Sequence, residues 1–369
     1  MAKNDLDVAI IGAGLNGLAL AIALRMFGIE AKVYEKVEQP RLEATSIMMW
    51  PEGMQVLAAL TGVEQVKRIG NQADWLTIVT ERFAPLQKVS MQTADTQVNA
   101  PLGLFHRADV HQLLLDCYGA DNVISGRDCS VKDDTILLNN EPLQADVIVG
   151  ADGVFSQVRK FVAPQTSIRA PGVYSCRGVV DFACDEIAND QCYVFAGPKS
   201  RVVTYTYDRQ RQSKFWFAAC PLPQHEVLDK ARILQEFSSY APCLLEMIAQ
   251  TPESQIVASP LVDTAPFESW SRDNAVLVGD ACCAVLPTVG IGFSLGIENA
   301  FILAQCLASN FNDVDSALRR YQLRAQHRSH ELQRITSRLS ELSYHEIFDA
   351  QEVLEVFQQF ATVKSRSPF

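Results

Sequence analysis

The stretch that decides the fold lies at residues 8–35 and reads VAIIGAGLNGLALAIALRMFGIEAKVYE. Val8–Ile11 is a short apolar run, typical of a parallel strand that is buried on both faces. Residues 14–27 have the pattern of a helix, and residues 31–35 have that of a second strand. Strand, helix and strand within about 30 residues form a βαβ unit. The stretch therefore predicts a Rossmann-type α/β domain.

The turn between the first strand and the helix is rich in glycine. Gly12 permits a tight turn, Gly14 lets a diphosphate approach the backbone, and Gly17 lets the helix pack against the sheet. The N–H groups at the start of the helix favour a bound diphosphate. Glu35 ends the second strand, where a carboxylate can accept hydrogen bonds from ribose hydroxyls. These residues predict a dinucleotide site but do not separate NAD from FAD.

Composition excludes several classes of function. The 369 residues are 48% hydrophobic and 20% charged, which is typical of a soluble globular protein. A formal net charge of −11, without a basic run, argues against a nucleic-acid partner. No apolar run is long enough to span a membrane. Ten irregularly spaced cysteines indicate reduced, mostly buried thiols in a cytoplasmic protein, and no His, Cys or Asp cluster has metal-ligand spacing.

Two later segments also have the character of buried strands. Residues 147–149 and 275–278 are apolar, and each runs directly into Gly or Asp, which predicts functional loops at the carboxyl ends of sheet strands. Residues 172–220 are rich in Val, Tyr, Phe and Trp with turn residues between them, which predicts an antiparallel sheet. The C-terminal part turns helical, with apolar residues at helical spacing.

The expected architecture is a Rossmann-type dinucleotide-binding domain of the α/β class, interrupted by a mainly antiparallel β-sheet substrate domain and completed by C-terminal helices. We assign residues 1–75, 100–171 and 265–369 to the discontinuous first domain. Residues 76–99 and 172–264 are assigned to the sheet domain.

Two further motifs favour FAD over NAD. Residues 150–159 read GADGVFSQVR, and residues 279–281 read GDA, followed by Pro287 and Glu298. Together with residues 12–35, these motifs resemble the FAD-dependent aromatic hydroxylases, the group A flavoprotein monooxygenases that include para-hydroxybenzoate hydroxylase. The resemblance covers the whole chain in the right order, and it implies that the Rossmann-type domain is a GR2-like FAD-binding domain. It is strongest to the short single-component branch that includes salicylate and urate hydroxylases.

The resemblance implies roles for single residues. Asp280 would bind the ribityl chain of FAD, Arg107 would lie near the flavin, and Asp152 would lie near the diphosphate and the NAD(P)H path. The glycines around Ile291 precede a predicted helix at residues 293–307, whose first N–H groups would favour the anion of a reduced flavin. The full set of expected cofactor-binding residues is Gly12, Gly14, Leu15, Gly17, Glu35, Lys36, Arg41, Arg107, Asp152, Gly279, Asp280, Gly290, Ile291 and Gly292.

The resemblance also implies the reaction. NADH or NADPH would reduce non-covalently bound FAD, dioxygen would add at flavin C4a, and the resulting hydroperoxide would hydroxylate or epoxidise a small aromatic or otherwise electron-rich substrate. The flavin carries this chemistry, so no catalytic side chain is assigned. We expect a monomer or a homodimer whose substrate lies between the flavin and the β-sheet domain. The pocket residues we predict are Met49, Arg201, Tyr205, Trp216 and Pro287.

Departures from the family pattern keep alternatives open. Cys282 and Cys283 stand where the family usually has Ala-His, and Asn299 stands where it usually has Asp. Thr288 replaces an acid of the urate branch, which argues against urate as the substrate. A flavoprotein oxidase, a reductase or a halogenase of the same fold remains an alternative, as does a non-catalytic FAD-binding protein.

Overall fold

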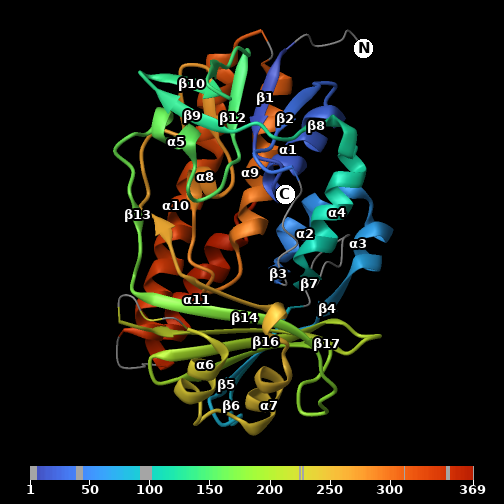
Figure 1. Cartoon of the computed structure of the whole chain (residues 1–369), viewed down its shortest axis with the longest axis vertical. Coiled ribbons are helices and arrows are strands. Elements are labelled where there is room, and N and C mark those ends of the chain that lie inside the picture. The colour runs from blue at the N-terminus through green and yellow to red at the C-terminus, as the bar shows by residue number, and fades with distance from the viewer. Residues whose placement is uncertain are drawn as a thin grey trace.

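The computed structural model describes residues 6–38, 45–91, 102–223, 226, 228–310, 312–345 and 350–368. An α/β region lies at the top of Figure 1 and a large β-sheet lies below it, with helix α11 (Ala350–Lys364) beside the sheet. This arrangement confirms the predicted fold class.

The α/β region is built on a six-stranded sheet. Its strands in spatial order are β20 (Ser271–Arg272), β21 (Ala275–Leu277), β12 (Val147–Gly150), β1 (Val8–Ile11), β2 (Ala31–Tyr34) and β8 (Val123–Ile124). All neighbours pair in parallel except β20 and β21. Strand β1 is central and wholly buried, as its continuous apolar sequence predicts. The carboxyl ends of β1, β12 and β21 therefore meet at one edge of the sheet.

Helices surround this sheet, and the first of them packs directly against the C-terminal third of the chain. Helix α1 (Leu15–Met26) contacts both α4 (Arg107–Tyr118) and α9 (Gly292–Ser309). The remaining helices of the region are α2 (Pro51–Thr61), α3 (Val63–Ile69), α5 (Gln157–Val162), α8 (Asp280–Cys283) and α10 (Val314–Tyr344). The long helix α10 contacts both α9 and α11, so it joins the C-terminal helices to the α/β region.

Three small sheets and two short 3-10 helices complete this region and its connections. The first small sheet contains β3 (Ser46–Met49), β7 (Leu102–His106) and β4 (Gly70–Ala73). The second contains β9 (Cys129–Lys132), β10 (Thr135–Leu138) and β11 (Glu141–Pro142), and the third pairs β13 (Ile168–Arg169) with β19 (Asp263–Thr264). The 3-10 helices are Ala120–Asn122 and Glu253–Gln255.

The lower sheet has seven strands. In spatial order they are β18 (Ile256–Pro260), β14 (Val173–Asp181), β17 (Ser213–Pro221), β16 (Ser200–Asp208), β15 (Gln191–Gly197), β5 (Trp75–Thr80) and β6 (Pro85–Ser90). All neighbours are antiparallel except β15 and β5. Two segments of the chain thus build one sheet, and the domain boundaries drawn from the sequence remain a prediction.

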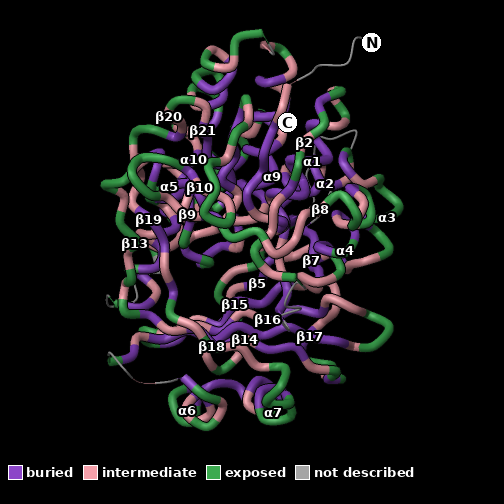
Figure 2. Tube along the Cα trace, turned by 45° about the horizontal axis from the view of Figure 1, so that its top comes forward, coloured by how far each residue is buried: buried purple, intermediate pink, exposed green. Residues whose placement is uncertain are grey.

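The two faces of the lower sheet have different neighbours. Helices α6 (Lys230–Glu236) and α7 (Pro242–Gln250) lie under its outer face, where they cover a separate apolar core around Trp216 and Met247 (Figure 2). The inner face turns toward the α/β region. Because successive residues of a strand point to opposite faces, each strand supplies side chains to both sides.

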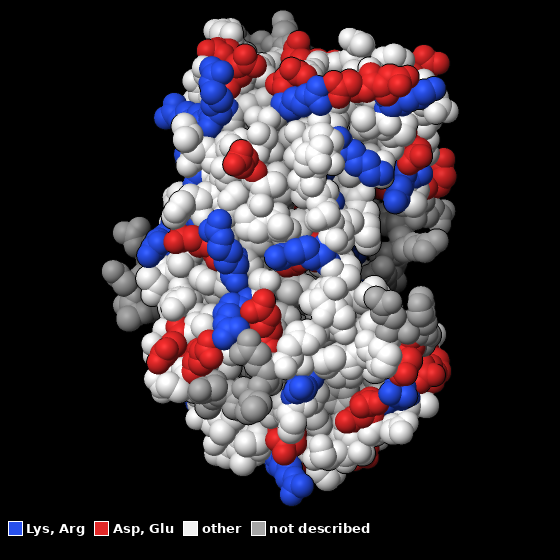
Figure 3. All heavy atoms as spheres, turned by 90° about the vertical axis from the view of Figure 1, so that its left-hand side faces the viewer, with Lys and Arg blue, Asp and Glu red and all other residues white. Residues whose placement is uncertain are grey.

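Surface and thiol properties agree with the composition. On the face shown in Figure 3, Lys and Arg side chains are interspersed with Asp and Glu. Among the described residues, no helix combines the length and the apolar character needed to cross a bilayer. All ten cysteines are free thiols, and only Cys117 and Cys184 are not buried, which confirms the prediction of mostly buried thiols.

Substituting Gly17 by Ala should destabilise the fold, because its Cβ would lie 1.9 Å from the carbonyl oxygen of Gly12. We expect a loss of about 1–3 kcal/mol in the free energy of unfolding, as for other overpacked sites. Urea unfolding of the protein without cofactor measures it. Gly14→Ala is the matched control, because a Cβ there meets nothing within 4 Å. Equal stability of the two variants would contradict the packing argument.

Candidate active site

The predicted loops meet at the carboxyl edge of the parallel sheet. The N–H of Ala151 donates to the carbonyl of Ile11 at 2.8 Å, and the N–H of Val278 donates to the carbonyl of Gly150 at 2.9 Å. These bonds continue the pairing of β1, β12 and β21 beyond the strands. The glycine-rich turn, the Asp-Gly turn and the Gly-Asp turn therefore lie next to one another.

The glycine-rich turn has the backbone conformation that its sequence predicts. Gly12 has a φ of +109°, and a Cβ there would lie 2.6 Å from the carbonyl oxygen of Ala151. Gly14 precedes the first turn of α1, and no side chain caps that helix end. Gly14 and Leu15 line a cavity, whereas Gly17 does not line it and packs against the backbone of Gly12. The open N–H groups and the close backbone suit a bound diphosphate.

Two side chains hold this turn in shape. The carboxylate of Glu35 accepts hydrogen bonds from the N–H of Ala13 at 2.9 Å and from the N–H of Val37 at 3.1 Å. The Nε2 of buried His111 lies 2.9 Å from the carbonyl oxygen of Ala13. Glu35 thus orders the turn from its position at the end of β2. The bracing role of His111 was missed, and its nearest signal was its place in the HRADVH segment.

Two other expected cofactor-binding residues lie near the end of β2. Lys36 is exposed and follows Glu35 directly. Arg41 lies outside the described residues.

Asp152 caps a helix. Its Oδ2 accepts a hydrogen bond from the N–H of Gln157 at 2.7 Å, and the hydroxyl of Ser156 donates to its Oδ1. Burial raises the pKa of Asp152, while these hydrogen bonds lower it. Ala151 and Gly153 on either side face the cavity, so the carboxylate fixes the turn that lines the site.

Arg159 joins the second motif to the third. This buried guanidinium donates to the carbonyl of Ala281 at 3.0 Å and to the carbonyl of Val154. Burial lowers the pKa of Arg159, and the nearby carboxylates Asp152 and Asp280 raise it. The sequence showed Arg159 as part of the motif but did not indicate that it would contact a backbone carbonyl of α8.

The Gly-Asp turn brings a carboxylate into the cavity. Gly279 has a φ of +63°, and a Cβ there would lie 2.3 Å from Nδ2 of Asn16. Asp280 and Arg107 both line the cavity. Asp280 is exposed to the cavity, but the surrounding protein desolvates its carboxylate and raises its pKa, whereas the positive charges of Arg107 and Arg159 lower it. Oδ1 of Asn16 is buried without a hydrogen-bond partner among the described residues, so this cradle offers unsatisfied polar groups to a ligand.

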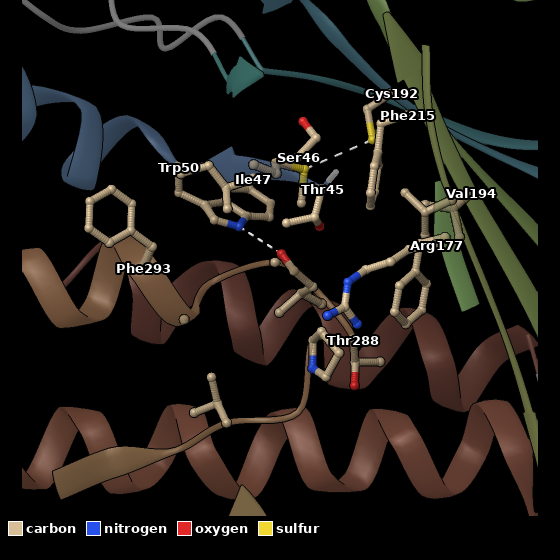
Figure 4. Close-up of a pocket in the computed structure, with 18 of the residues that line it drawn as sticks. Thr45, Ser46, Ile47, Trp50, Arg177, Cys192, Val194, Phe215, Thr288 and Phe293 are labelled. Carbon is tan, nitrogen blue, oxygen red and sulfur yellow. Dashed lines mark hydrogen bonds between the residues drawn. The ribbon is translucent and has the colours of Figure 1, made fainter. Parts of the chain in front are cut away.

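The loop before α9 forms the next part of the wall. The indole N–H of Trp50 donates to the carbonyl of Val289 at 2.8 Å, as Figure 4 shows. Gly290 has a φ of +63°, and a Cβ there would lie 2.5 Å from Cε of Met48. Helix α9 begins at Gly292, one residue before the predicted start. Gly290 and Gly292 face the cavity, whereas Ile291 is wholly buried and does not line it.

The cavity has a volume of about 550 Å³, within the range of small-molecule sites. Of the predicted pocket residues, Arg201, Tyr205 and Pro287 line it. Met49 and Trp216 do not, and these two predictions were wrong.

Ser46, Ile47 and Met48 of β3 all line the cavity, whereas Met49 at the end of that strand is wholly buried. The alternation of side chains along a strand explains the error at Trp216. Phe215 and Phe217 face the cavity, so Trp216 lies on the outer face of the sheet, where its indole donates to Oγ1 of Thr251 at 2.8 Å.

The residues that depart from the family pattern have structural partners. Cys282 is buried, its Sγ donates to the carbonyl of Gly279 at 3.3 Å, and burial raises its pKa to about 12. The Sγ of Cys283 lies 3.6 Å from the carbonyl of Ser329, and the amide of Asn299 donates to the hydroxyl of the same serine at 3.1 Å. Burial also raises the pKa of Cys283, and both thiols are packed inside the protein.

A family model described as an FAD binding domain matches residues 5–336. The chain belongs to this family. Relatives in it include monooxygenases and hydroxylases, and the chain is a member of the FAD-dependent monooxygenase family. The cofactor is FAD, and the glycine cradle, the uncapped start of α1 and the unpartnered amide oxygen of Asn16 fit it.

Individual relatives are distant. The aurachin C monooxygenase/isomerase of Stigmatella aurantiaca is 29% identical over 329 residues, covering 87% of this chain and 85% of the relative. An FAD-dependent urate hydroxylase of Mycolicibacterium vanbaalenii is 27% identical, covering 86% and 83%. The crystal structure of Klebsiella pneumoniae HpxO complexed with FAD and uric acid has the same fold, with a TM-score of 0.85, 22% identity and 99% and 94% coverage.

Substituting Asp280 by Ala should weaken FAD binding about 10- to 100-fold, the effect of losing hydrogen bonds to a charged group. Titration of the apoprotein with FAD, followed by flavin fluorescence, measures the change in Kd. Asp116→Ala removes an exposed carboxylate on α4 and should leave the Kd unchanged. If Asp280→Ala binds FAD as the unchanged protein does, Asp280 has no role in holding the cofactor.

Proposed function

We propose that this protein is an NAD(P)H-consuming monooxygenase that hydroxylates or epoxidises a small, electron-rich, acidic substrate, with an aromatic ring as the first choice. The observation that carries the proposal is the continuity of the cavity. Its lining includes Asn16 and Asp280 from the dinucleotide loops and Arg201 and Phe217 from the seven-stranded sheet. A ligand bound against the sheet would therefore share one continuous cavity with the cofactor and lie beside it.

When bound, FAD would accept electrons from a nicotinamide and activate dioxygen. The protein then has to bind, orient and shield the reactants. At Gly292, the 18-residue helix α9 begins with no side-chain cap, so its first N–H groups favour negative charge beside the cavity. Trp50 and the loop from Pro287 to Gly290 close this side against water.

The sheet side of the cavity is mainly apolar. Strand pairing aligns side chains in rows across β5, β15, β16, β17 and β14. In the first row, the residues that line the cavity are Leu76, Cys192, Tyr205 and Phe215. In the second row they are Ile78, Val194, Val203, Phe217 and Arg177, of which only Arg177 is charged. Such a surface supports binding of a flat, apolar ring.

The third row supports an acidic group on the substrate. Arg201 is flanked by Ala196 and Ala219, whose small side chains leave space beside the guanidinium. Arg201 lines the cavity, and it forms no hydrogen bond or ion pair with any residue that the structure describes. Arg177 also reaches into the cavity, toward the loop that carries Thr288 (Figure 4). A carboxylate, a phenolate or another electronegative group would satisfy the Arg201 guanidinium.

Reconstitution with FAD and a substrate screen test the proposal. NADH and NADPH consumption, product oxygenation and hydrogen peroxide release are measured with phenols, aromatic acids and heteroaromatic compounds. For a monooxygenase, we expect an aromatic substrate to accelerate the consumption of NADH or NADPH and to appear as an oxygenated product. Peroxide without an oxygenated product across the screen would favour an oxidase, and absence of reduction by either nicotinamide would favour a binding role.

Substituting Arg201 by Met should raise KM for the best aromatic acid of that screen about 10- to 100-fold, because a charge-assisted hydrogen bond is lost. The FAD absorption spectrum should not change. Arg211→Gln, at an exposed arginine in the turn before β17, is the control and should leave KM unchanged. An unchanged KM in Arg201→Met would show that substrate binding does not depend on an acidic group near Arg201.

The C-terminal helices supply the last wall of the cavity. Val353 and Phe357 of α11 line it, and so do Leu339 and Ser343 of α10. All four lie beyond residue 336, where the match to the family model ends. This wall therefore supports a substrate preference particular to this chain.

Ion pairs fix α11 in place. Lys364 pairs with Glu52, and Arg328 donates to the carbonyl of Lys364 at 2.9 Å. Arg328 also pairs at 2.9 Å with Glu298, whose side chain is wholly buried.

Substituting Phe357 by Ala should enlarge the chamber and shift preference toward larger rings. We expect about a 10-fold change in the ratio of kcat/KM for a naphthol over a phenol, the discrimination typical of an apolar pocket. Gln358→Ala changes the exposed neighbour on the same helix and should leave the ratio unchanged. An unaltered ratio in Phe357→Ala would show that α11 does not set substrate size.

A further inference from the structure

A cluster of sulfur and oxygen ligands lies outside the active site. Cys184, Glu186 and Cys243 each offer one ligand atom, and these atoms all lie within 4.8 Å of one another. The sequence spacing predicted no metal site, because Cys243 is far from the other two along the chain. Only folding brings the three residues together.

The cluster joins two elements on the outer side of the seven-stranded sheet. Cys184 and Glu186 lie in the segment between β14 and β15, and buried Cys243 lies in the first turn of α7 (Figures 1 and 2). None of the three residues lines the cavity. A bond between them would tie α7 to the segment that leads into β15.

The donor set matches zinc. Thiolates are the preferred protein ligands of Zn²⁺, and a carboxylate oxygen commonly completes its coordination. With Zn–S bonds of about 2.3 Å, ligand atoms around a tetrahedral ion lie about 3.5–4 Å apart. Sγ of Cys184 and Oε2 of Glu186 are 4.0 Å apart and all three ligand atoms lie within 4.8 Å of one another, so a contraction of about 1 Å at most would be needed. Because Glu186 is exposed, an ion can reach the cluster from solvent on that side.

A buried cation nearby complements the charge of such a site. Lys214 is wholly buried, and its ammonium group donates to two neutral oxygens, Oγ1 of Thr206 at 2.9 Å and the carbonyl of Ile187 at 3.4 Å. Burial lowers the pKa of Lys214, and negative charge on Cys184 raises it. A zinc ion with two thiolates and one carboxylate carries one net negative charge, which Lys214 would balance.

We propose that Cys184, Glu186 and Cys243 bind one Zn²⁺ ion, with solvent as the fourth ligand, and that this ion stabilises the contact between α7 and the segment before β15. Binding replaces the two thiol protons, which pass to solvent. The site is structural and independent of the flavin chemistry.

Zinc analysis of the full-length FAD-loaded protein, purified under reducing conditions without chelator, tests the proposal. We expect one zinc ion per chain by elemental analysis, and a higher Tm with Zn²⁺ than after chelation. Co²⁺ in its place should give the visible bands of a tetrahedral thiolate site, at longer wavelength than the flavin bands.

Glu186→Gln and Cys184→Ser change exposed or half-buried ligands, so these variants should fold. Each should weaken Zn²⁺ binding at least 10-fold and abolish the Tm increase, while NAD(P)H turnover stays unchanged. Cys117→Ser, at the exposed cysteine outside the cluster, should bind zinc as the unchanged protein does.

Three outcomes would overturn the proposal. They are absence of zinc at micromolar free Zn²⁺, equal zinc content in the Glu186→Gln and Cys184→Ser variants, and a Cys184–Cys243 disulfide in the protein as purified.

Discussion

The parallel pairing of β1, β12 and β21 is the constraint on which the rest of the structure depends. Backbone hydrogen bonds fix the register of these strands, and the bonds from Ala151 to Ile11 and from Val278 to Gly150 carry it past their ends. Because parallel strands end at the same edge, loops from three distant parts of the chain meet there. A one-residue shift in this register would move every one of these loops away from the cavity.

Polar side chains then hold the loops in their binding shape. Glu35 and His111 fix the glycine-rich turn from one side, and Asp152 caps the helix that follows the second turn. Arg159 ties the second turn to the third. Each of these groups satisfies backbone atoms that would otherwise be buried without partners, so the cradle is preorganised for the cofactor.

The sequence predicted the α/β class, the inserted sheet and the FAD family, and these predictions are confirmed. The fold could be predicted because glycines with positive φ and buried apolar strands are local requirements, whereas the family followed from the resemblance of three motifs. The sequence was wrong for Met49 and Trp216, because the face to which a side chain turns depends on strand register and on the neighbours on both sides. It also missed the bracing roles of Arg159 and His111, whose partners lie far away in sequence.

By itself, the sequence determined that this protein has a dinucleotide fold with glycine-rich loops after its parallel strands, because short glycine motifs state their conformational needs in adjacent residues. Only the tertiary structure decided which side chains face the cavity. The alignment of Arg201 with two alanines, the wall from α11 and the meeting of Cys184 with Cys243 all depend on pairing between distant segments. Long-range packing sets those neighbours, and no local pattern encodes it.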